Sequence, residues 1–260
     1  MTGARVRLVR ADPAGNVTLL VLTPVAAADR ARTAVELLDR FGGEQVGFLA
    51  PPRLGGEARL EMMGGEFCGN ALRSLGALRA REAGPGVHEL EISGCDHLLR
   101  VRTDLPGGSV RGEMPLPERL EIWHGLETAV FPGIVHALWR GEPGDPAHAR
   151  ALTAALAEHY AAPAAGVMYL WEADRTMVPA VYVRDTDTLF FESSCASGSA
   201  AAAALLAREA GGTFPLRQPG GEIIARAEMT AGELSALTIE GPVTLGEAFE
   251  TVIDGEAVLV

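Results

Sequence analysis

The stretch E-F-C-G-N-A at residues 66–71 and the stretch E-S-S-C-A-S at residues 192–197 decide the expected fold. Each combines a glutamate and a cysteine with small residues, and each runs into an apolar segment with helical spacing. Strand-like segments surround both helices in their own half of the chain. The two stretches therefore indicate an internal duplication, with two α+β halves that each contain a helix beginning at a cysteine.

From this pattern we predict an α+β protein of two pseudo-symmetric domains, each a curved β-sheet around a central helix. The passage Pro115–Arg119, rich in proline and charge, interrupts the strands. We therefore expect domains at residues 1–120 and 121–260, and the last strand, residues 248–253, could pack back on the N-terminal domain. The predicted helices cover residues 27–41, 71–81, 148–158 and 197–210.

The composition excludes several classes of protein. The 260 residues carry a net charge of −12, and 48% of them are hydrophobic, which is typical of an ordered globular protein. A negative chain is a poor partner for nucleic acids or anionic membranes, since both are polyanions. The sequence shows no signal peptide and no membrane-spanning segment. With only three cysteines, we expect reduced thiols and a cytoplasmic location.

The absence of lysine excludes one mechanism. All 22 basic residues are arginines, whereas a pyridoxal-phosphate racemase needs a lysine to hold its cofactor as a Schiff base. The six histidines never pair at the short spacings that metal sites favour. We therefore expect neither a cofactor nor a metal.

The positions of Cys68 and Cys195 point to acid–base chemistry. At the start of a helix, backbone N–H groups and the helix dipole stabilise negative charge, which lowers a thiol pKa towards neutrality. Racemisation needs one group to remove the α-proton from one face and another to deliver a proton to the opposite face. Buried free cysteine is otherwise a small hydrophobe, and we prefer that structural interpretation for Cys95, which no predicted helix follows. A disulfide is disfavoured by the expected compartment.

Taken together, these segments resemble the diaminopimelate epimerase superfamily, whose members use two facing cysteines without a cofactor. Residues 14–16 (A-G-N) are similar to a substrate-contacting turn, and residues 66–70 and 192–198 to the two cysteine motifs. Within the superfamily, the likeness is closest to histidine racemases of opine-type metallophore biosynthesis. The segments that carry this likeness are D-P-A-G-N-V-T at 12–18, E-Q-V-G-F at 44–48, S-G-C at 93–95 and Q-P-G-G at 218–221.

The resemblance implies that Cys68 and Cys195 are catalytic, supported by Glu44 and Glu192, in a cleft between the domains. Glu44 could equally be an ordinary charge at the entry to a strand. His136 resembles a histidine near the first cysteine of the epimerases, although a lone histidine on an apolar strand is more often a core residue. The residues expected to bind the amino acid are Asn16, Gly69, Asn70, Ala196, Ser197, Gly198 and Ser199.

A departure from the family bears on the substrate. Diaminopimelate epimerases carry a Glu-Arg-Gly stretch several residues before the second cysteine, and its arginine holds the distal carboxylate. Here only Ser193 and Ser194 separate Glu192 from Cys195, so a second carboxylate would lose its charge-assisted partner. We therefore expect interconversion of L- and D-histidine, a small-molecule partner with one carboxylate.

Three alternatives stay open: a diaminopimelate epimerase, an isomerase that uses a carboxylate in place of two thiols, and a non-catalytic protein that binds an amino acid or a metal. The sequence also leaves the oligomeric state undecided, a homodimer being one option.

Overall fold

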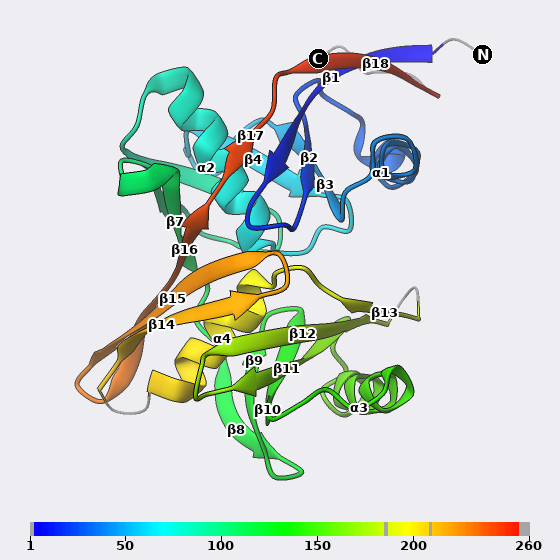
Figure 1. Ribbon diagram of the computed structural model, residues 1–260. Coiled ribbons are helices and arrows are strands. Elements are labelled where there is room, and N and C mark those ends of the chain that lie inside the picture. Colours follow the sequence, from blue (N-terminus) through cyan, green and yellow to red (C-terminus); the bar gives the residue numbers. More distant parts are fainter. Residues whose placement is uncertain (1–2, 185–186, 208–209, 255–260) are drawn as a thin grey trace. The chain divides into compact units, whose positions relative to one another are not determined.

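The computed structural model describes residues 3–184, 187–207 and 210–254. By their internal contacts the residues form two compact units, one of residues 1–112 and 241–260 (unit 1) and one of residues 113–240 (unit 2). Figure 1 shows the elements of both units coloured along the sequence. The expected boundary at residues 120/121 falls inside strand β8 (Arg119–Trp123), and the last strand pairs with the first strand of unit 1.

The described residues of unit 1 form two α-helices, a short 3-10 turn and a mixed sheet. Hydrogen bonds join its strands in the order β18-β1-β2-β3-β4-β5-β6-β7, and β17 pairs with the end of β1. Its elements are β1 (Gly3–Asp12), β2 (Thr18–Val21), α1 (Ala27–Phe41), β3 (Gln45–Ala50), β4 (Ala58–Met62), α2 (Gly69–Ala83), β5 (Val87–Ile92), β6 (Leu99–Arg102), the 3-10 turn η1 (Pro106–Gly108), β7 (Ser109–Met114), β17 (Thr244–Leu245) and β18 (Phe249–Asp254).

Unit 2, where the structure describes it, likewise contains two α-helices and a mixed sheet. Its strands follow the order β8-β9-β10-β11-β12-β14-β15-β16, and β13 lies beside β12. Its elements are β8 (Arg119–Trp123), β9 (Leu126–Phe131), β10 (Ile134–Arg140), α3 (Pro146–His159), β11 (Ala164–Trp171), β12 (Thr176–Val183), β13 (Thr188–Phe191), α4 (Ala196–Ala207), β14 (Gly212–Gln218), β15 (Gly221–Thr230) and β16 (Glu233–Pro242).

The two units repeat the same connections. In unit 1, β2 and β3 are parallel neighbours joined through α1, and β4 and β5 are parallel neighbours joined through α2. In unit 2, α3 joins the parallel pair β10 and β11, and α4 lies in the connection between the parallel strands β12 and β14. Parallel neighbours need such a crossover, whereas antiparallel ones need only a hairpin. This repeated order is what an internal duplication of sequence produces.

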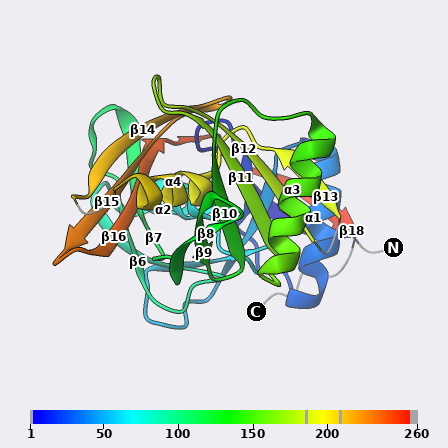
Figure 2. The same cartoon turned by 90° about the horizontal axis from the view of Figure 1, so that it is seen from below.

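Strand alternation gives each sheet two apolar faces. In unit 2, Val135 and Ala137 of β10 pack in one cluster with Ala149 and Leu156 of α3, and Figure 2 shows α3 along β11 and β12. His136 lies between them in sequence and faces the other way, towards α4. Helix α4 contacts β9, β10, β11, β14 and β15, so strands surround it within its unit (Figure 1).

The helices that follow the cysteines are suited to such burial. Residues Ala200–Ala204 of α4 are all buried, because alanine lets strands approach a helix closely from several sides. A helix without a polar face is typical of a buried position. In α2 the same closeness depends on Gly76, where an added Cβ would lie 2.3 Å from Cγ1 of Val101.

The sequence predicted the positions of the four α-helices found among the described residues. Helix α1 has the expected bounds. Its buried face includes Ala34 and Leu37, whereas the apolar side chain of Val35 is 61% exposed. The other three begin one or two residues earlier than predicted, and residues 208 and 209 of the expected last helix lie outside the described residues. Strand β8 was not predicted, because its Leu120 and Ile122 are exposed beside charged residues. Within the described ranges, no helix has both the length and the apolar character that a membrane crossing needs.

We predict that Gly76→Ala destabilises unit 1. Alanine favours a helix over glycine by ~1 kcal/mol, but the new methyl group would overlap the fully buried Val101, and overpacking costs about 1–3 kcal/mol. Urea unfolding should therefore show a net loss of about 1 kcal/mol. In a double-mutant cycle with Val101→Ala, the added methyl should cost less than it does beside Val101. Additive effects of the two substitutions would contradict this close packing.

Candidate functional site

Cys68 caps the helix that follows it. Helix α2 begins at Gly69, and Cys68 has the extended backbone of an N-cap residue, with φ −136° and ψ 110°. Its Sγ accepts a hydrogen bond from the backbone N–H of Ala71 at 3.4 Å, in the manner of a capping side chain. The thiol also donates to Oε1 of Gln45 at 2.8 Å. Cys68 is buried, and these two hydrogen bonds hold its sulfur at the first turn of α2.

Asn16 and Glu44 form a hydrogen-bonded pair beside the residue that contacts Cys68. The Nδ2 group of Asn16 donates to Oε2 of Glu44 at 2.5 Å, and Glu44 directly precedes the Gln45 that contacts Cys68. Asn16 is 1% exposed, and its Oδ1 has no hydrogen-bond partner among the described residues. A buried acceptor without a partner costs ~1–3 kcal/mol, and this oxygen keeps its capacity to accept a hydrogen bond.

The turn before Asn16 is built by its own residues. The backbone N–H of Gly15 donates to the carboxylate of Asp12 at 2.6 Å, and Ala14 and Gly15 both have positive φ. An aspartate that bonds the backbone a few residues on is a common turn device. The expected A-G-N turn therefore forms, and it places Asn16 against Glu44.

A second turn supports the loop that leads to Cys68. The hydroxyl of Ser93 donates to the carbonyl of Glu66 and accepts from the N–H of Met62, both at 2.8 Å. Gly94 has φ +71°, and an added Cβ would lie 2.3 Å from the backbone nitrogen of Phe67. Only glycine fits there, so the S-G-C segment positions the first cysteine.

Cys195 has the corresponding place in unit 2. It directly precedes α4 and is 4% exposed, and its Sγ accepts from the N–H of Gly198 at 3.3 Å. Its backbone N–H donates to Oε1 of Gln218 at 2.8 Å, and Oγ of Ser197 lies 3.6 Å from the sulfur. An added Cβ on Gly198 would overlap the buried Met168, so this close approach also requires glycine.

The expectation of a lowered thiol pKa is wrong for Cys195. Burial raises the pKa of this thiol well above its ordinary value, and the negative charge and hydrogen bond of Glu192 raise it further. The hydrogen bonds from Ser197 and Gly198 lower the pKa but do not offset these effects. Cys195 is therefore a protonated thiol at neutral pH.

Two of the expected substrate contacts have other partners. The hydroxyl of Ser199 donates to the carbonyl of Cys195 at 2.6 Å and accepts from Nε2 of Gln218 at 2.9 Å, while the N–H of Ser199 also bonds that carbonyl. Ser199 thus links the backbone of Cys195 to the side chain of Gln218. Oδ1 of Asn70 accepts a hydrogen bond from Arg73 at 2.8 Å, so this oxygen already has a partner within α2.

His136 is fully buried and bonded to a predicted site residue. Its Nε2 lies 2.9 Å from Oγ of Ser197, and burial lowers the pKa of the imidazole to about 3. The ring is therefore neutral at physiological pH. It lies in unit 2, on the strand that faces α4.

Sequence reasoning missed two glutamines. Gln45 accepts from the Cys68 thiol, and Gln218 fixes the backbone of Cys195. Both lie in segments that carry the resemblance to the racemases, E-Q-V-G-F and Q-P-G-G, and that was the available signal. The roles could not be assigned because an amide side chain gives no characteristic spacing.

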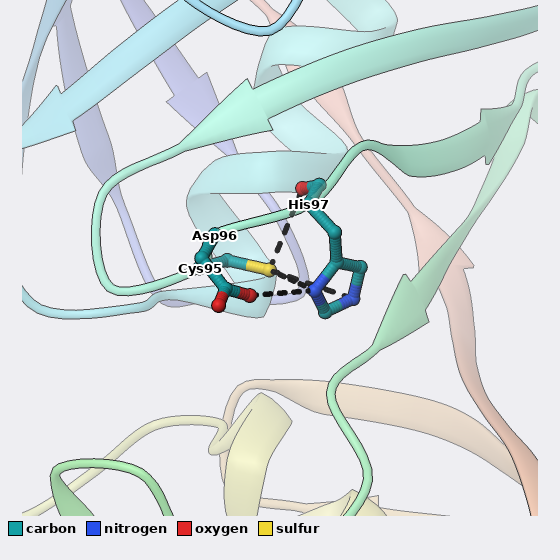
Figure 3. Close-up of side chains that lie close together, drawn as sticks. All are labelled: Cys95, Asp96 and His97. Atoms are coloured by element: carbon teal, nitrogen blue, oxygen red, sulfur yellow. Dashed lines mark hydrogen bonds and ion pairs between the residues drawn. The ribbon is translucent and has the colours of Figure 1, made fainter.

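One group of side chains has the composition of a metal site. In Figure 3, the Cys95 sulfur lies beside the His97 ring, 3.5 Å from Nδ1, and Nδ1 is 3.0 Å from the carboxylate of Asp96. The three ligand atoms lie within 4.8 Å of one another, so together they could hold a metal ion. Asp96 and His97 are exposed, and hydrogen bonds already account for the arrangement. The sequence signal for this group is a Cys-x-His spacing at residues 95–97, which contains one histidine and therefore no histidine pair.

Unit 2 also has an open surface hollow of about 630 Å³. Its lining includes Arg140, which forms ion pairs with Glu127 and Glu172. The cation is thus already neutralised, and none of the predicted site residues lines the hollow.

The fold is shared with enzymes that invert amino acids. The crystal structure of a hydroxyproline epimerase from Agrobacterium vitis, with bound trans-4-hydroxy-L-proline, matches with a TM-score of 0.68 at 15% identity. The match covers 98% of this chain and 93% of that chain. At this identity the likeness concerns the fold alone, a mixed α+β fold in which strands predominate.

Sequence comparison is more specific. The family model described as the histidine racemase CntK N-terminal domain matches residues 5–249. A histidine racemase from Fusobacterium nucleatum is 26% identical over 211 residues, which cover 74% of this chain and 78% of that protein. The histidine racemase of Staphylococcus aureus is 26% identical over 273 aligned residues, 95% of both chains. This chain belongs to the histidine racemase family.

We predict that Glu192→Gln makes the Cys195 thiol more acidic. In a Cys68→Ser/Cys95→Ser background, Cys195 is the single thiol, and its iodoacetamide reaction should follow an apparent pKa above that of an ordinary cysteine. Removing the neighbouring negative charge should lower this pKa, so that alkylation at pH 8 becomes several-fold faster. The exposed Glu158→Gln is a control of equal charge change. An unchanged profile for Glu192→Gln would contradict the assigned contact.

Proposed function

We propose that the protein is a cofactor-independent amino-acid racemase that interconverts L- and D-histidine. The observation that carries this proposal is the equivalent placement of two cysteines, each at the first turn of the buried helix of its own unit. The family membership supports histidine as the substrate. In this proposal, Cys68 and Cys195 act on opposite faces of one α-carbon.

Two sulfurs are sufficient for the two proton transfers of such a reaction. A thiolate removes the α-proton from one face, and a thiol delivers its proton to the other face. At the end the two sulfurs have exchanged protonation states, so the enzyme is ready for the opposite enantiomer. Because its raised pKa keeps Cys195 protonated, we assign it as the proton donor of the resting enzyme and Cys68 as the base.

The carbanion formed in between needs stabilisation. The first-turn N–H groups of a helix have no acceptor within the helix, and the dipole there favours negative charge. We propose that the backbone at Gly69, Asn70, Ala196 and Ser197, with Gly198 keeping the approach open, holds the α-carboxylate and its enolate-like form. These donors would act at the carboxylate oxygens while the sulfurs act at the α-carbon.

The substrate's nitrogen atoms require acceptors. The unpartnered Oδ1 of Asn16 and the carboxylate of Glu44 offer oxygens next to the Cys68 site. We propose that they receive N–H groups of the α-ammonium or the imidazole. The same pair of acceptors would repel a second carboxylate, and this favours histidine over diaminopimelate. Glu192 would tune Cys195 rather than bind substrate.

Several finer assignments follow from the same proposal. The mechanism requires both thiols to be reduced, which suits the cytoplasm. It requires no cofactor and no partner other than the amino acid. The fold would be a diaminopimelate epimerase-like variant, and the resemblance to metallophore-related racemases suggests that D-histidine serves the biosynthesis of a metallophore.

The proposal predicts racemisation with solvent exchange. Incubated with L-histidine in deuterated water, the enzyme should produce D-histidine that carries deuterium at the α-carbon, as measured by chiral chromatography and mass spectrometry. Cys68→Ser and Cys195→Ser should each reduce the rate by at least about 10²-fold, because each removes an acid–base group. Cys95→Ser should leave the rate unchanged.

A panel of other L-amino acids and diaminopimelate tests the substrate assignment in the same assay. Turnover of diaminopimelate without turnover of histidine would overturn the substrate. Racemisation that survives either cysteine substitution would overturn the two-thiol mechanism. Tightly bound metal that disappears with Cys95→Ser, in a protein without any racemase activity, would favour a binding protein instead.

A further inference from the structure

Three potential metal ligands come together in the connection between β5 and β6. Cys95, Asp96 and His97 are consecutive in sequence, and their ligand atoms all lie within 4.8 Å of one another. Figure 3 shows the Cys95 sulfur beside the imidazole, and the carboxylate of Asp96 reaches the same ring nitrogen. None of the three residues belongs to the predicted racemase site. The group is therefore a candidate for a separate binding function.

The distances within the group are close to those around a tetrahedral ion. With usual Zn²⁺ bond lengths, sulfur and nitrogen ligands lie about 3.5 Å apart, and nitrogen and carboxylate oxygen about 3.3 Å apart. Here Sγ of Cys95 lies 3.5 Å from Nδ1 of His97, and this nitrogen lies 3.0 Å from Oδ1 of Asp96. Sγ also lies 3.7 Å from Nε2, so the sulfur faces the plane of the ring. The exposed imidazole therefore has to turn about its side-chain bonds to direct Nδ1 at an ion.

The hydrogen bonds of the group leave its ligand atoms available to an ion. Among the described residues, the side-chain hydrogen bonds of Cys95, Asp96 and His97 all stay within these three residues. An ion that replaces these bonds therefore deprives no other part of the protein of a partner. The side chains of Asp96 and His97 are 102% and 59% exposed, so an ion reaches them directly from solvent.

The donor atoms select the class of ion. A thiolate, an imidazole and a carboxylate suit Zn²⁺, Co²⁺ and Ni²⁺, whereas Mg²⁺ and Ca²⁺ require oxygen ligands. Burial raises the pKa of the Cys95 thiol, so the metal-free group holds a thiol, and a binding ion displaces its proton to solvent. The thiolate and the carboxylate of Asp96 then balance the two positive charges. Three protein ligands leave one tetrahedral position for water.

The turn that carries these ligands also supports the first cysteine motif. The hydroxyl of Ser93 and the close packing of Gly94 join the turn to the loop that leads to Cys68. The side chain of Cys95 itself packs against the apolar cluster that contains Cys68. An ion at Cys95 would therefore restrain a turn that is already anchored to this loop.

We propose that Cys95, Asp96 and His97 bind one divalent ion of the class of Zn²⁺, Co²⁺ and Ni²⁺, and that this ion stabilises the turn beside Cys68. The ion takes no part in the proton transfers proposed for Cys68 and Cys195. The site is thus additional to the proposed racemase function and does not depend on it.

Cobalt spectroscopy tests the ligands directly. In the 260-residue Cys68→Ser/Cys195→Ser protein, Cys95 is the single thiol, so a sulfur-to-cobalt charge-transfer band reports on it alone. Co²⁺ should produce this near-ultraviolet band with one ion per chain, and Zn²⁺ should displace the cobalt and remove the band. Adding Cys95→Ser should abolish both the band and the stoichiometric binding. A protein that binds no Co²⁺, or binds it without the band, would overturn the site.

Variants at the other two ligands complete the assignment. His97→Gln and Asp96→Asn should each weaken Co²⁺ binding at least about tenfold, because each removes a ligand, while the sulfur band stays visible at saturating cobalt. His159→Gln and Asp39→Asn remove an exposed imidazole and an exposed carboxylate elsewhere and are the matched controls. Equal weakening by the controls would indicate non-specific binding and would overturn the site.

Hydrogen exchange tests the effect on the turn. Saturating Zn²⁺ should slow amide exchange several-fold at residues 93–97 and in the loop at 63–67, and Cys95→Ser should cancel both effects. If the double serine variant does not fold, the wild-type protein compared with Cys95→Ser gives the same answer. Protection confined to residues 93–97 would overturn the stabilising role, and no protection would overturn the site. None of these measurements uses racemisation, so their outcome is separate from that of the proposed function.

Discussion

Each unit places a cysteine sulfur at the first turn of a helix buried among its own strands, where a backbone N–H donates to it. The rest of the structure depends on this constraint. A buried helix start needs small residues for strands to approach, such as Gly76 and the alanines of α4. It also needs separate supports for the loop before it, and the S-G-C turn and Gln218 supply them.

The same backbone device is used with different neighbours. The thiol of Cys68 meets the neutral amide of Gln45, whereas Cys195 meets the carboxylate of Glu192 and the hydroxyl of Ser197. Helix-start geometry alone would make the two sulfurs equivalent, but burial and a nearby negative charge outweigh it at Cys195. Such an asymmetry suits a racemase, because at any moment one sulfur must hold a proton and the other must lack it.

Much of the fold could be predicted from the sequence, because local patterns decide it. Apolar periodicity located the helices, and the repeated cysteine context indicated a duplication, with which the repeated strand connections agree. Strand β8 was not predicted, because its Leu120 and Ile122 face solvent. In the site, the pairing of Asn16 with Glu44 and the contact between His136 and Ser197 join residues distant in sequence. Burial also raises the pKa of Cys195, opposite to the expected direction, and no local sequence pattern encodes burial.

If the sulfurs of Cys68 and Cys195 act on one α-carbon, a bifunctional thiol reagent should bridge them. Dibromobimane becomes strongly fluorescent when it alkylates two neighbouring thiols. In the Cys95→Ser protein, where Cys68 and Cys195 are the two remaining thiols, we expect one fluorescent bridge per chain. Peptide mass spectrometry should identify the bridge, and saturating histidine should suppress it. Separate single adducts on Cys68 and Cys195, with no bridge in a folded protein, would contradict it.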